Sequence, residues 1–162
     1  MSIVTKTGDD GHTDIIGGTR LPKDSPLIEC LGTLDELNAF LGDAKVSLCD
    51  THAIELITEI QKDLFSLMGI IAGTPVSAGG IYQSRLDQAV EKLEAEMPPL
   101  ASFVVPGATV ASAKLHIARA VCRRAERRLV GLDLCGETKT TAVPYINRLS
   151  DLLFLLAQKE LP

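Results

Sequence analysis

The chain has 162 residues, of which 46% are hydrophobic, and it carries a formal net charge of −5. This length fits one domain with a buried core, and the composition argues against disorder. The acidic balance argues against a nucleic-acid-binding protein, and no apolar run is long enough to cross a bilayer. The four cysteines show no zinc spacing and the N-terminus has no secretory signal, so we expect free thiols in a cytoplasmic protein.

Residues 1–26 contain four glycines and two prolines and show no helical or strand periodicity. Gly and Pro at this density interrupt regular structure, so the sequence predicts an extended loop here. A structureless loop of this length inside a compact domain is usually functional or disordered. We therefore treat residues 1–26 as a candidate binding segment.

The rest of the chain shows apolar residues at steps of three and four, the spacing of amphipathic helices. These stripes predict helices over 27–44, 53–71, 86–97 and 115–132, and a last helix that starts near Pro144. Pro98-Pro99 ends the third helix, because proline cannot continue one. The sequence thus predicts an all-α, single-domain protein (1–162). In it, a four-helix up-and-down core plus one extra helix (27–160) follows the N-terminal loop.

The segment from Thr5 to Thr13 reads TKTGDDGHT. Its glycines allow sharp turns whose backbone N–H groups can point together at an anion, and Lys6, Arg20 and Lys23 add cations nearby. It is not a Walker A loop, because the GxxxxGK[ST] pattern is absent. On composition alone, a flexible polar tail explains the segment as well as a phosphate grip does.

Five arginines and no lysine occur between Arg119 and Arg128. Arg119, Arg123 and Arg127 are spaced i, i+4, i+8 and lie near one helix face, while Arg124 and Arg128 form a second row. A solvated face with local ion pairs is the ordinary explanation. The exclusive use of arginine, which binds phosphate or carboxylate with two parallel hydrogen bonds, favours an anion site or a subunit interface.

Three further polar positions leave alternatives open. Asp35 is either an exposed carboxylate or the partner of an arginine on another helix or chain, and Asn38 lies one turn later on the same face. Asn147 either caps the last helix or contacts a ligand. His116 is a structural hydrogen-bonder rather than a catalyst, and the histidines and cysteines form no transition-metal set.

Taken together, these sequence motifs resemble those of the PduO-type ATP:cob(I)alamin adenosyltransferases. The matching stretches cover nearly the whole chain in the family's order: 5–13, 18–23, 29–38, 103–107, LHIARAVCRRAERR at 115–128 and YINRLSDLLF at 145–154. The resemblance implies a ferritin-like five-helix bundle. It also implies transfer of the 5′-deoxyadenosyl group of ATP to the cobalt of cob(I)alamin, with triphosphate as the other product.

The resemblance also implies a homotrimer with ATP at each subunit interface, between the N-terminal loop of one chain and the Arg-rich helix of its neighbour. Asp35 and Arg119 would form a salt bridge across that interface. Phe103 would lie against the corrin and displace the lower axial ligand of cobalt. The implied nucleotide contacts are Thr5, Lys6, Thr7, Gly8, Thr13, Asp14, Lys23, Arg123, Arg124, Glu126, Arg127 and Asn147.

The implied chemistry suits these residues, because cobalt(I) is itself a strong nucleophile and needs no activating base. Catalysis then depends on orientation and on stabilising the leaving charge, for which Arg123 and Arg127 are candidates. Mg²⁺ would share the phosphate charge, bound mainly by phosphate oxygens and water. Cobalamin is a substrate, a reductase or a B12-dependent enzyme is a candidate partner, and neither nucleic acid nor a membrane is expected.

Two other functions remain compatible with the sequence. One is an ATP-binding cofactor carrier or regulatory protein on the same fold, and the other is a structural oligomer that uses its arginines for interface ion pairs. The chain departs from many family members at Ala108, where they have glycine. It also ends soon after the last helix, from which we expect a more open corrin pocket.

Overall fold

The computed structural model describes residues 4–16, 18–74, 81–99, 103–134 and 136–161. Its helices are α1 (Pro26–Lys45), α2 (Thr51–Ile71), α3 (Gln83–Glu96), α4 (Val110–Val130) and α5 (Gly136–Lys159). Two short strands, β1 (His12–Asp14) and β2 (Arg20–Pro22), precede them. None of the helices described is both long and apolar enough to cross a membrane.

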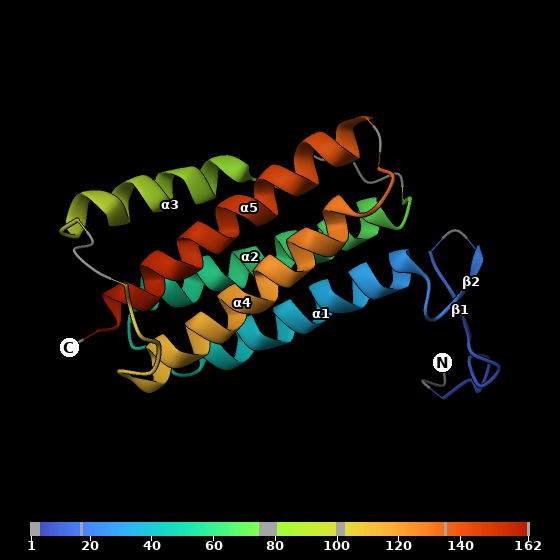
Figure 1. Cartoon of the computed structure of the whole chain (residues 1–162), viewed down its shortest axis with the longest axis horizontal. Coiled ribbons are helices and arrows are strands. Elements are labelled where there is room, and N and C mark those ends of the chain that lie inside the picture. The colour runs from blue at the N-terminus through green and yellow to red at the C-terminus, as the bar shows by residue number, and fades with distance from the viewer. Residues whose placement is uncertain (1–3, 17, 75–80, 100–102, 135, 162) are drawn as a thin grey trace.

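Four of the helices form the core and the fifth lies outside it (Figure 1). α1 packs against α2 and α4, and α5 packs against α4 and α2, so these four close a bundle. Neighbours in this bundle run antiparallel, and α3 lies along α5 on the outer side (Figure 1). The predicted architecture of a four-helix core plus one extra helix is confirmed.

The helices begin and end where the sequence supplies caps and breaks. The side chain of Asp50 accepts a hydrogen bond from the backbone N–H of His52 at the start of α2, at 2.9 Å. Thr109 does the same at the start of α4, accepting from the N–H of Ser112 at 3.1 Å. Each such cap satisfies a backbone donor that the first helical turn leaves unpaired, which stabilises a helix by about 1 kcal/mol.

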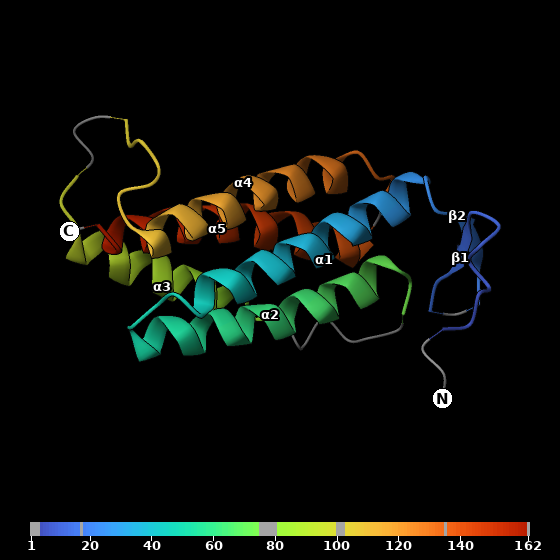
Figure 2. The same ribbon diagram turned by 90° about the horizontal axis from the view of Figure 1, so that it is seen from below.

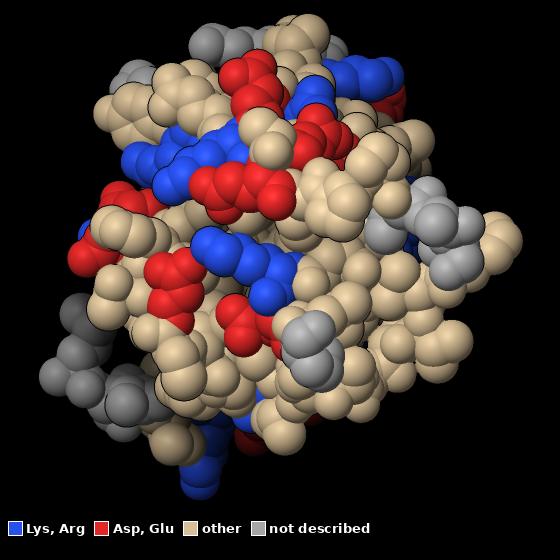
Figure 3. Space-filling view, turned by 90° about the vertical axis from the view of Figure 1, so that its left-hand side faces the viewer, with Lys and Arg blue, Asp and Glu red and all other residues tan. Residues whose placement is uncertain are grey.

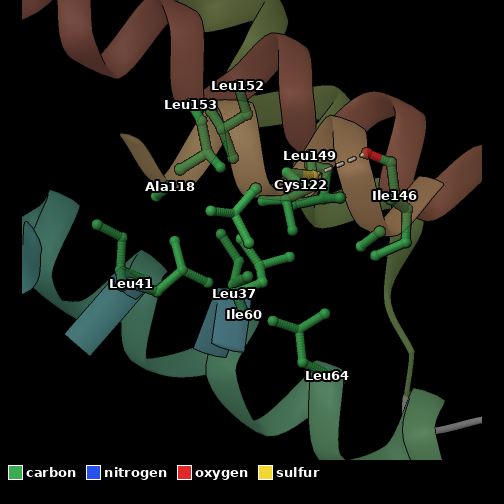
Figure 4. Close-up of a cluster of buried hydrophobic side chains, with 14 of the residues drawn as sticks. Leu37, Leu41, Ile60, Leu64, Ala118, Cys122, Ile146, Leu149, Leu152 and Leu153 are labelled. Carbon is green, nitrogen blue, oxygen red and sulfur yellow. Dashed lines mark hydrogen bonds between the residues drawn. The ribbon is translucent and has the colours of Figure 1, made fainter. Parts of the chain in front are cut away.

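The predicted apolar stripes meet in one core (Figure 4). Each of the four bundle helices contributes residues that are fully shielded from solvent, and the thiol of Cys122 donates a hydrogen bond to the carbonyl of Ile146 at 3.3 Å. Aliphatic side chains dominate the contact between the helices: Leu37, Leu41, Ile60, Leu64, Ala118, Leu149, Leu152 and Leu153. This packing holds α1, which carries Asp35, and α4, which carries the arginine rows, in a fixed relation.

Two sequence predictions about the elements are wrong. The last helix starts at Gly136 rather than near Pro144, and Pro144 lies inside it. Proline removes one helical hydrogen bond, but the burial of Ala142, Tyr145 and Ile146 on both sides of it keeps the helix continuous. Within the supposedly structureless residues 1–26, the segments 12–14 and 20–22 pair as an antiparallel hairpin.

The hairpin extends beyond the bundle at the N-terminal end of α1 (Figures 1 and 2). Its register pairs His12 with Pro22 and Asp14 with Arg20. Gly18 sits in the connecting turn with φ +82°, a left-handed conformation that glycine adopts without strain. Three-residue strands are too short to show an alternating pattern, which is why periodicity did not predict them.

The opposite end of the bundle carries acidic and basic side chains next to one another (Figure 3). Lys159 pairs with Asp50 at 2.9 Å, and Lys114 pairs with Asp43 at 2.7 Å. Because positive charge at this end is matched by neighbouring carboxylates, it is not a basic patch for an anion.

A buried polar cluster joins three helices. The carboxylate of Asp63 on α2 is 3% exposed and accepts from the hydroxyl of Tyr145 on α5 at 2.9 Å and from Arg85 on α3 at 2.8 Å. Burial and the nearby Asp63 carboxylate raise the pKa of the Tyr145 hydroxyl, so it remains a donor. This cluster fixes α3 and the first half of α5 against the bundle.

Replacing Tyr145 with Phe is expected to lower the free energy of unfolding by about 2 kcal/mol, because a buried carboxylate loses a hydrogen-bond donor. Urea denaturation of the two proteins measures this difference. Tyr82→Phe is the matched control. Tyr82 is 52% exposed and its ring lies 5.0 Å from the Arg85 guanidinium, a contact that phenylalanine retains. An equal loss in both variants would show that the Asp63 hydrogen bond is not what stabilises the protein.

Candidate nucleotide-binding site

The N-terminal segment is folded into consecutive turns. The N–H of Asp9 donates to the carbonyl of Lys6, and that of Gly11 donates to the carbonyl of Gly8, each at 3.3 Å. Lys6 has φ +58°, a left-handed conformation that non-glycine residues rarely adopt. Strained backbone of this kind concentrates at functional sites. The N–H groups of Asp9 and Gly11 are used within these turns, so the segment is folded rather than an extended tail.

Lys23, which follows the second strand of the hairpin, binds the backbone of these turns. Its ammonium group donates to the carbonyl of Gly8 at 2.7 Å, and its backbone N–H donates to the carbonyl of Gly11 at 2.9 Å. A Cβ atom at position 8 would lie 3.0 Å from the Lys23 nitrogen, so a larger residue there would force the Lys23 side chain to shift. The structure therefore brings together Gly8 and Lys23, two of the predicted nucleotide contacts.

The two arginine rows of α4 have different surroundings. In one row, Arg124 forms an ion pair with Glu36, and Arg128 binds both Glu29 and the hydroxyl of Thr33, so this row fastens α4 to α1. In the other row, the side chains of Arg123 and Arg127 are exposed.

In this second row the Arg127 guanidinium donates a hydrogen bond to the backbone carbonyl of Arg123, at 3.0 Å. Within the described part of the chain, no carboxylate pairs with either arginine of this row. We therefore expect this row, rather than the row against α1, to be free to bind an anion.

Glu126 and Asn147 are also brought together. The amide of Asn147 on α5 donates to the carboxylate of Glu126 on α4 at 2.8 Å. This bond places both side chains at the surface next to the free arginine row. Asn147 lies in the middle of α5 rather than in its first turn, so the helix-cap interpretation of this residue is wrong.

A groove of about 290 Å³ runs between α3, α4 and α5, and Arg119, Arg123 and Arg148 line it together with Asp151 and Phe154. Arg148 was not identified from the sequence, although its position next to Asn147 on a helix that faces α4 points to it. Arg148 is paired with Asp87 at 2.9 Å, and Glu94 and Asp151 also line the groove. Arg119 and Arg123 are therefore the cations of this groove that no ion pair among the described residues offsets.

Asp35 lies on another side of the molecule. It lines a groove of about 420 Å³ between α1 and α2 with Asn38, Gln61 and Phe65. The Asn38 side-chain oxygen is buried there without a hydrogen-bond partner among the described residues. Asp35 also borders a mainly apolar groove of about 460 Å³ beneath the hairpin. Asp35 and Arg119 thus line separate grooves, and one chain does not bring them together.

Phe103 precedes α4 and its side chain is fully exposed. The segment before α4 lies at the end of the bundle far from the hairpin (Figures 1 and 2). Arg119, Arg123 and Arg127 occupy successive turns between these ends and span about 12 Å along the helix axis. The candidate residues therefore follow the length of α4 rather than one compact pocket of a single chain.

His116 is 5% exposed on α4, and neither ring nitrogen has a hydrogen-bond partner among the described residues. Its ring packs edge-on against Phe154, with 5.9 Å between ring centroids. The structural hydrogen bond expected of His116 from the sequence is therefore not found in the described part of the chain. Burial and the Arg119 charge lower the pKa of His116 below its usual 6.5.

The lowered pKa of His116 predicts that stability falls as pH falls below about 6.5, because the unfolded chain then binds a proton that the folded chain excludes. The free energy of unfolding, measured at about pH 7.5 and about pH 5.5, should decrease more in the parent protein than in His116→Gln. Parallel pH dependence in the two proteins would contradict this assignment.

Comparison with known proteins places this arrangement in a family. A model of the cobalamin adenosyltransferase family matches residues 3–160. The chain is 39% identical to the corrinoid adenosyltransferase PduO of Salmonella typhimurium, over 99% of this chain and 50% of that protein. It is 40% identical to the corrinoid adenosyltransferase of Bacillus subtilis, over 98% of this chain and 86% of that protein.

Solved structures agree with the sequence comparison. A variant of the PduO-type ATP:corrinoid adenosyltransferase from Lactobacillus reuteri, complexed with cobalamin and ATP, matches with a TM-score of 0.82 and 33% identity. The match covers 96% of this chain and 91% of that one. The chain therefore belongs to the cobalamin adenosyltransferase family. Within it, the chain is similar to the PduO-type corrinoid adenosyltransferases, and the family and enzyme class predicted from the sequence are confirmed.

The chain spans half the length of the Salmonella relative and most of the Bacillus relative. Residues 3–160, which the family model covers, include every candidate site residue named above.

Proposed function

We propose that this chain transfers the 5′-deoxyadenosyl group of ATP to the cobalt of cob(I)alamin and releases triphosphate. The observation that carries the proposal is the row formed by Arg123 and Arg127, exposed on α4 while the adjacent row is paired with α1. Free, preorganised guanidinium groups suit a reaction in which a polyphosphate leaves.

In this reaction cobalt(I) attacks C5′ of ATP, and the bond between C5′ and the phosphate oxygen breaks. The triphosphate leaves with the electron pair, so negative charge develops on the bridging oxygen. Arg123 and Arg127 stabilise that charge, and no protein base is required because no proton is removed. Mg²⁺ enters with ATP as part of the substrate, bound mainly through phosphate oxygens and water.

ATP binding is assigned to residues from two chains of a homotrimer. The N-terminal segment of one chain contributes Thr5, Lys6, Thr7, Gly8, Thr13, Asp14 and Lys23. The neighbouring α4 and α5 contribute Arg123, Arg124, Glu126, Arg127 and Asn147. The separation of Asp35 and Arg119 into two grooves supports this arrangement, because their opposite charges can pair only between two copies. The pairing of Arg124 with Glu36 makes it the least available member of the second set.

The test is anaerobic incubation of the protein with MgATP and chemically reduced cobalamin. Appearance of the adenosylcobalamin absorbance, together with release of triphosphate, is expected. ATP binding without turnover would instead favour a cofactor carrier or regulatory protein on the same fold. No change in melting temperature with MgATP would favour a purely structural oligomer, because a ligand that binds only the native state must stabilise it.

Phe103 is assigned to the corrin side of the site, where its exposed ring displaces the lower axial ligand of cobalt. Loss of that ligand makes cobalt(II) easier to reduce, and the ring fills the space with apolar contact. Phe103→Ala is therefore expected to lower the rate with cob(II)alamin and a reductant by about tenfold or more, which corresponds to about 1.4 kcal/mol of barrier. The rate with cob(I)alamin supplied directly should change far less.

The matched control for this prediction is Val105→Ala. Val105 is 83% exposed in the same segment and loses an apolar side chain of its own. Equal effects of the two substitutions, or an equal loss with both cobalt oxidation states, would contradict the role assigned to Phe103.

A further inference from the structure

The segment proposed to bind triphosphate contains three carboxylates of its own: Asp9, Asp10 and Asp14. Carboxylates this close to a polyphosphate oppose its binding unless cations neutralise them. Among the described residues, no ion pair joins these carboxylates to Lys6 or Lys23, the two lysines of the segment. Arg20, the third cation of the segment, pairs with two of them, Asp10 and Asp14.

Arg20 is the first residue of β2, and its guanidinium group joins three parts of the segment. One terminal nitrogen donates to the backbone carbonyl of Thr7 at 2.7 Å and to both carboxylate oxygens of Asp10, at 2.8 and 2.9 Å. The other donates to Asp14 at 3.3 Å. The hairpin register places Arg20 opposite Asp14 and therefore within reach of all three groups.

A single exposed ion pair contributes little to stability, but a planar guanidinium shared among several acceptors is the exception. Asp10 in turn accepts from the backbone N–H of His12 at 3.1 Å, which ties the carboxylate to β1 as well. The Arg20 guanidinium holds the pKa of the Asp10 carboxyl below its usual value. Asp10 is thus ionised and bound, and its charge is offset within the segment.

We propose that Arg20 is a positioning residue for the nucleotide: it fastens Thr7, Asp10 and Asp14 in one arrangement and offsets the charge of Asp10, which would otherwise repel the triphosphate. This inference rests on the proposed adenosyltransferase function of the same site. Arg20 acts through the segment, and its guanidinium makes no contact with the reacting atoms. A lysine cannot replace it, because one ammonium group cannot reach both carboxylates and the Thr7 carbonyl in fixed directions.

The first test is kinetic and compares Arg20→Gln and Arg20→Lys with the parent protein. We expect KM for ATP to rise about tenfold or more in both variants, because the charge-assisted hydrogen bonds that order the segment are lost. The value of kcat at saturating ATP and KM for cobalamin should stay within about twofold, since Arg20 makes no transition-state contact. A large fall in kcat would overturn the proposal, and so would an unchanged KM for ATP.

The matched control is Lys92→Gln, which removes the same charge from the exposed surface of α3. Its KM for ATP should equal that of the parent protein, which excludes net charge as the cause. Failure of the parent protein to turn over would refute the proposed function but not the proposal for Arg20. Calorimetric titration with MgATP would then compare the affinities of Arg20→Gln and the parent directly.

The second test measures the fold of the segment by amide hydrogen exchange without added nucleotide. The backbone bonds from Gly11 to Gly8 and from Lys23 to Gly11 are the reporters. Exchange at residues 8–16 and 23 should accelerate in Arg20→Gln, while the helices and the melting temperature remain unchanged because the hairpin lies outside the bundle. Unchanged exchange in this segment would overturn the proposal.

Discussion

Replacing Arg123 with alanine is expected to lower kcat/KM for ATP by about 100- to 1,000-fold, the usual cost of losing one preorganised donor to a developing oxyanion. Arg123 borders the α3/α4/α5 groove and has no carboxylate partner in the described part of its own chain. Its guanidinium is therefore available to the leaving triphosphate. The measurement is initial-rate kinetics with varied MgATP and saturating cob(I)alamin.

Arg128→Ala is the matched control, because Arg128 lies on the same helix and loses the same side chain. Arg128 binds Glu29 and Thr33 on α1, so its loss should lower the melting temperature slightly and change kcat/KM for ATP far less. Equal kinetics for the two variants would mean that the two arginine rows of α4 are not functionally distinct.

The two arginine rows of α4 differ in a property that the sequence alone did not predict. Spacing i, i+4 identified both rows on α4 but did not identify which row faces another helix. The answer depends on α1, where Glu29 and Glu36 lie opposite Arg128 and Arg124 because the two helices run antiparallel. Only the packing of α1 against α4 fixes that register.

The helices themselves were largely predictable, because burial of one face imposes a period that the sequence must follow. The apolar stripe residues of α2 are all buried: Ala53, Ile57, Ile60, Leu64, Leu67 and Ile71. On α4 the stripe residues Leu115, Ala118, Cys122, Ala125 and Leu129 are buried as well. The exception, Leu132, is partly buried and follows the end of α4 at Val130.

The errors arose where local rules compete with tertiary contacts. Pro144 is a helix-starting signal, but α5 continues through it because the flanking residues are buried against the bundle. In the hairpin, Arg20 binds residues 6 to 13 positions earlier in the chain. Contacts of this kind produce no periodic pattern in the sequence. In both places, contacts between distant residues determine the structure.

In the proposed arrangement the ATP site requires a second chain, and this gives the prediction with the largest effect on assembly. Asp35→Arg and Arg119→Asp are each expected to abolish the trimer and nearly all activity, because each places like charges at the proposed interface. Sedimentation velocity measures the assembly, and the adenosylation assay measures activity. Swapping the charges of Asp43 and Lys114, which pair within one chain on the same two helices, is the control and should leave the trimer intact.

Mixing the two single variants distinguishes pairing between chains from pairing within one. In an interface between the two variant chains, opposite charges again face each other at positions 35 and 119, in either direction across the interface. A mixture should therefore recover part of the trimer and part of the activity, although neither protein has them alone. If Asp35 and Arg119 acted within one chain, no mixture could restore either property, and the assignment of the ATP site to a subunit interface would fail with it.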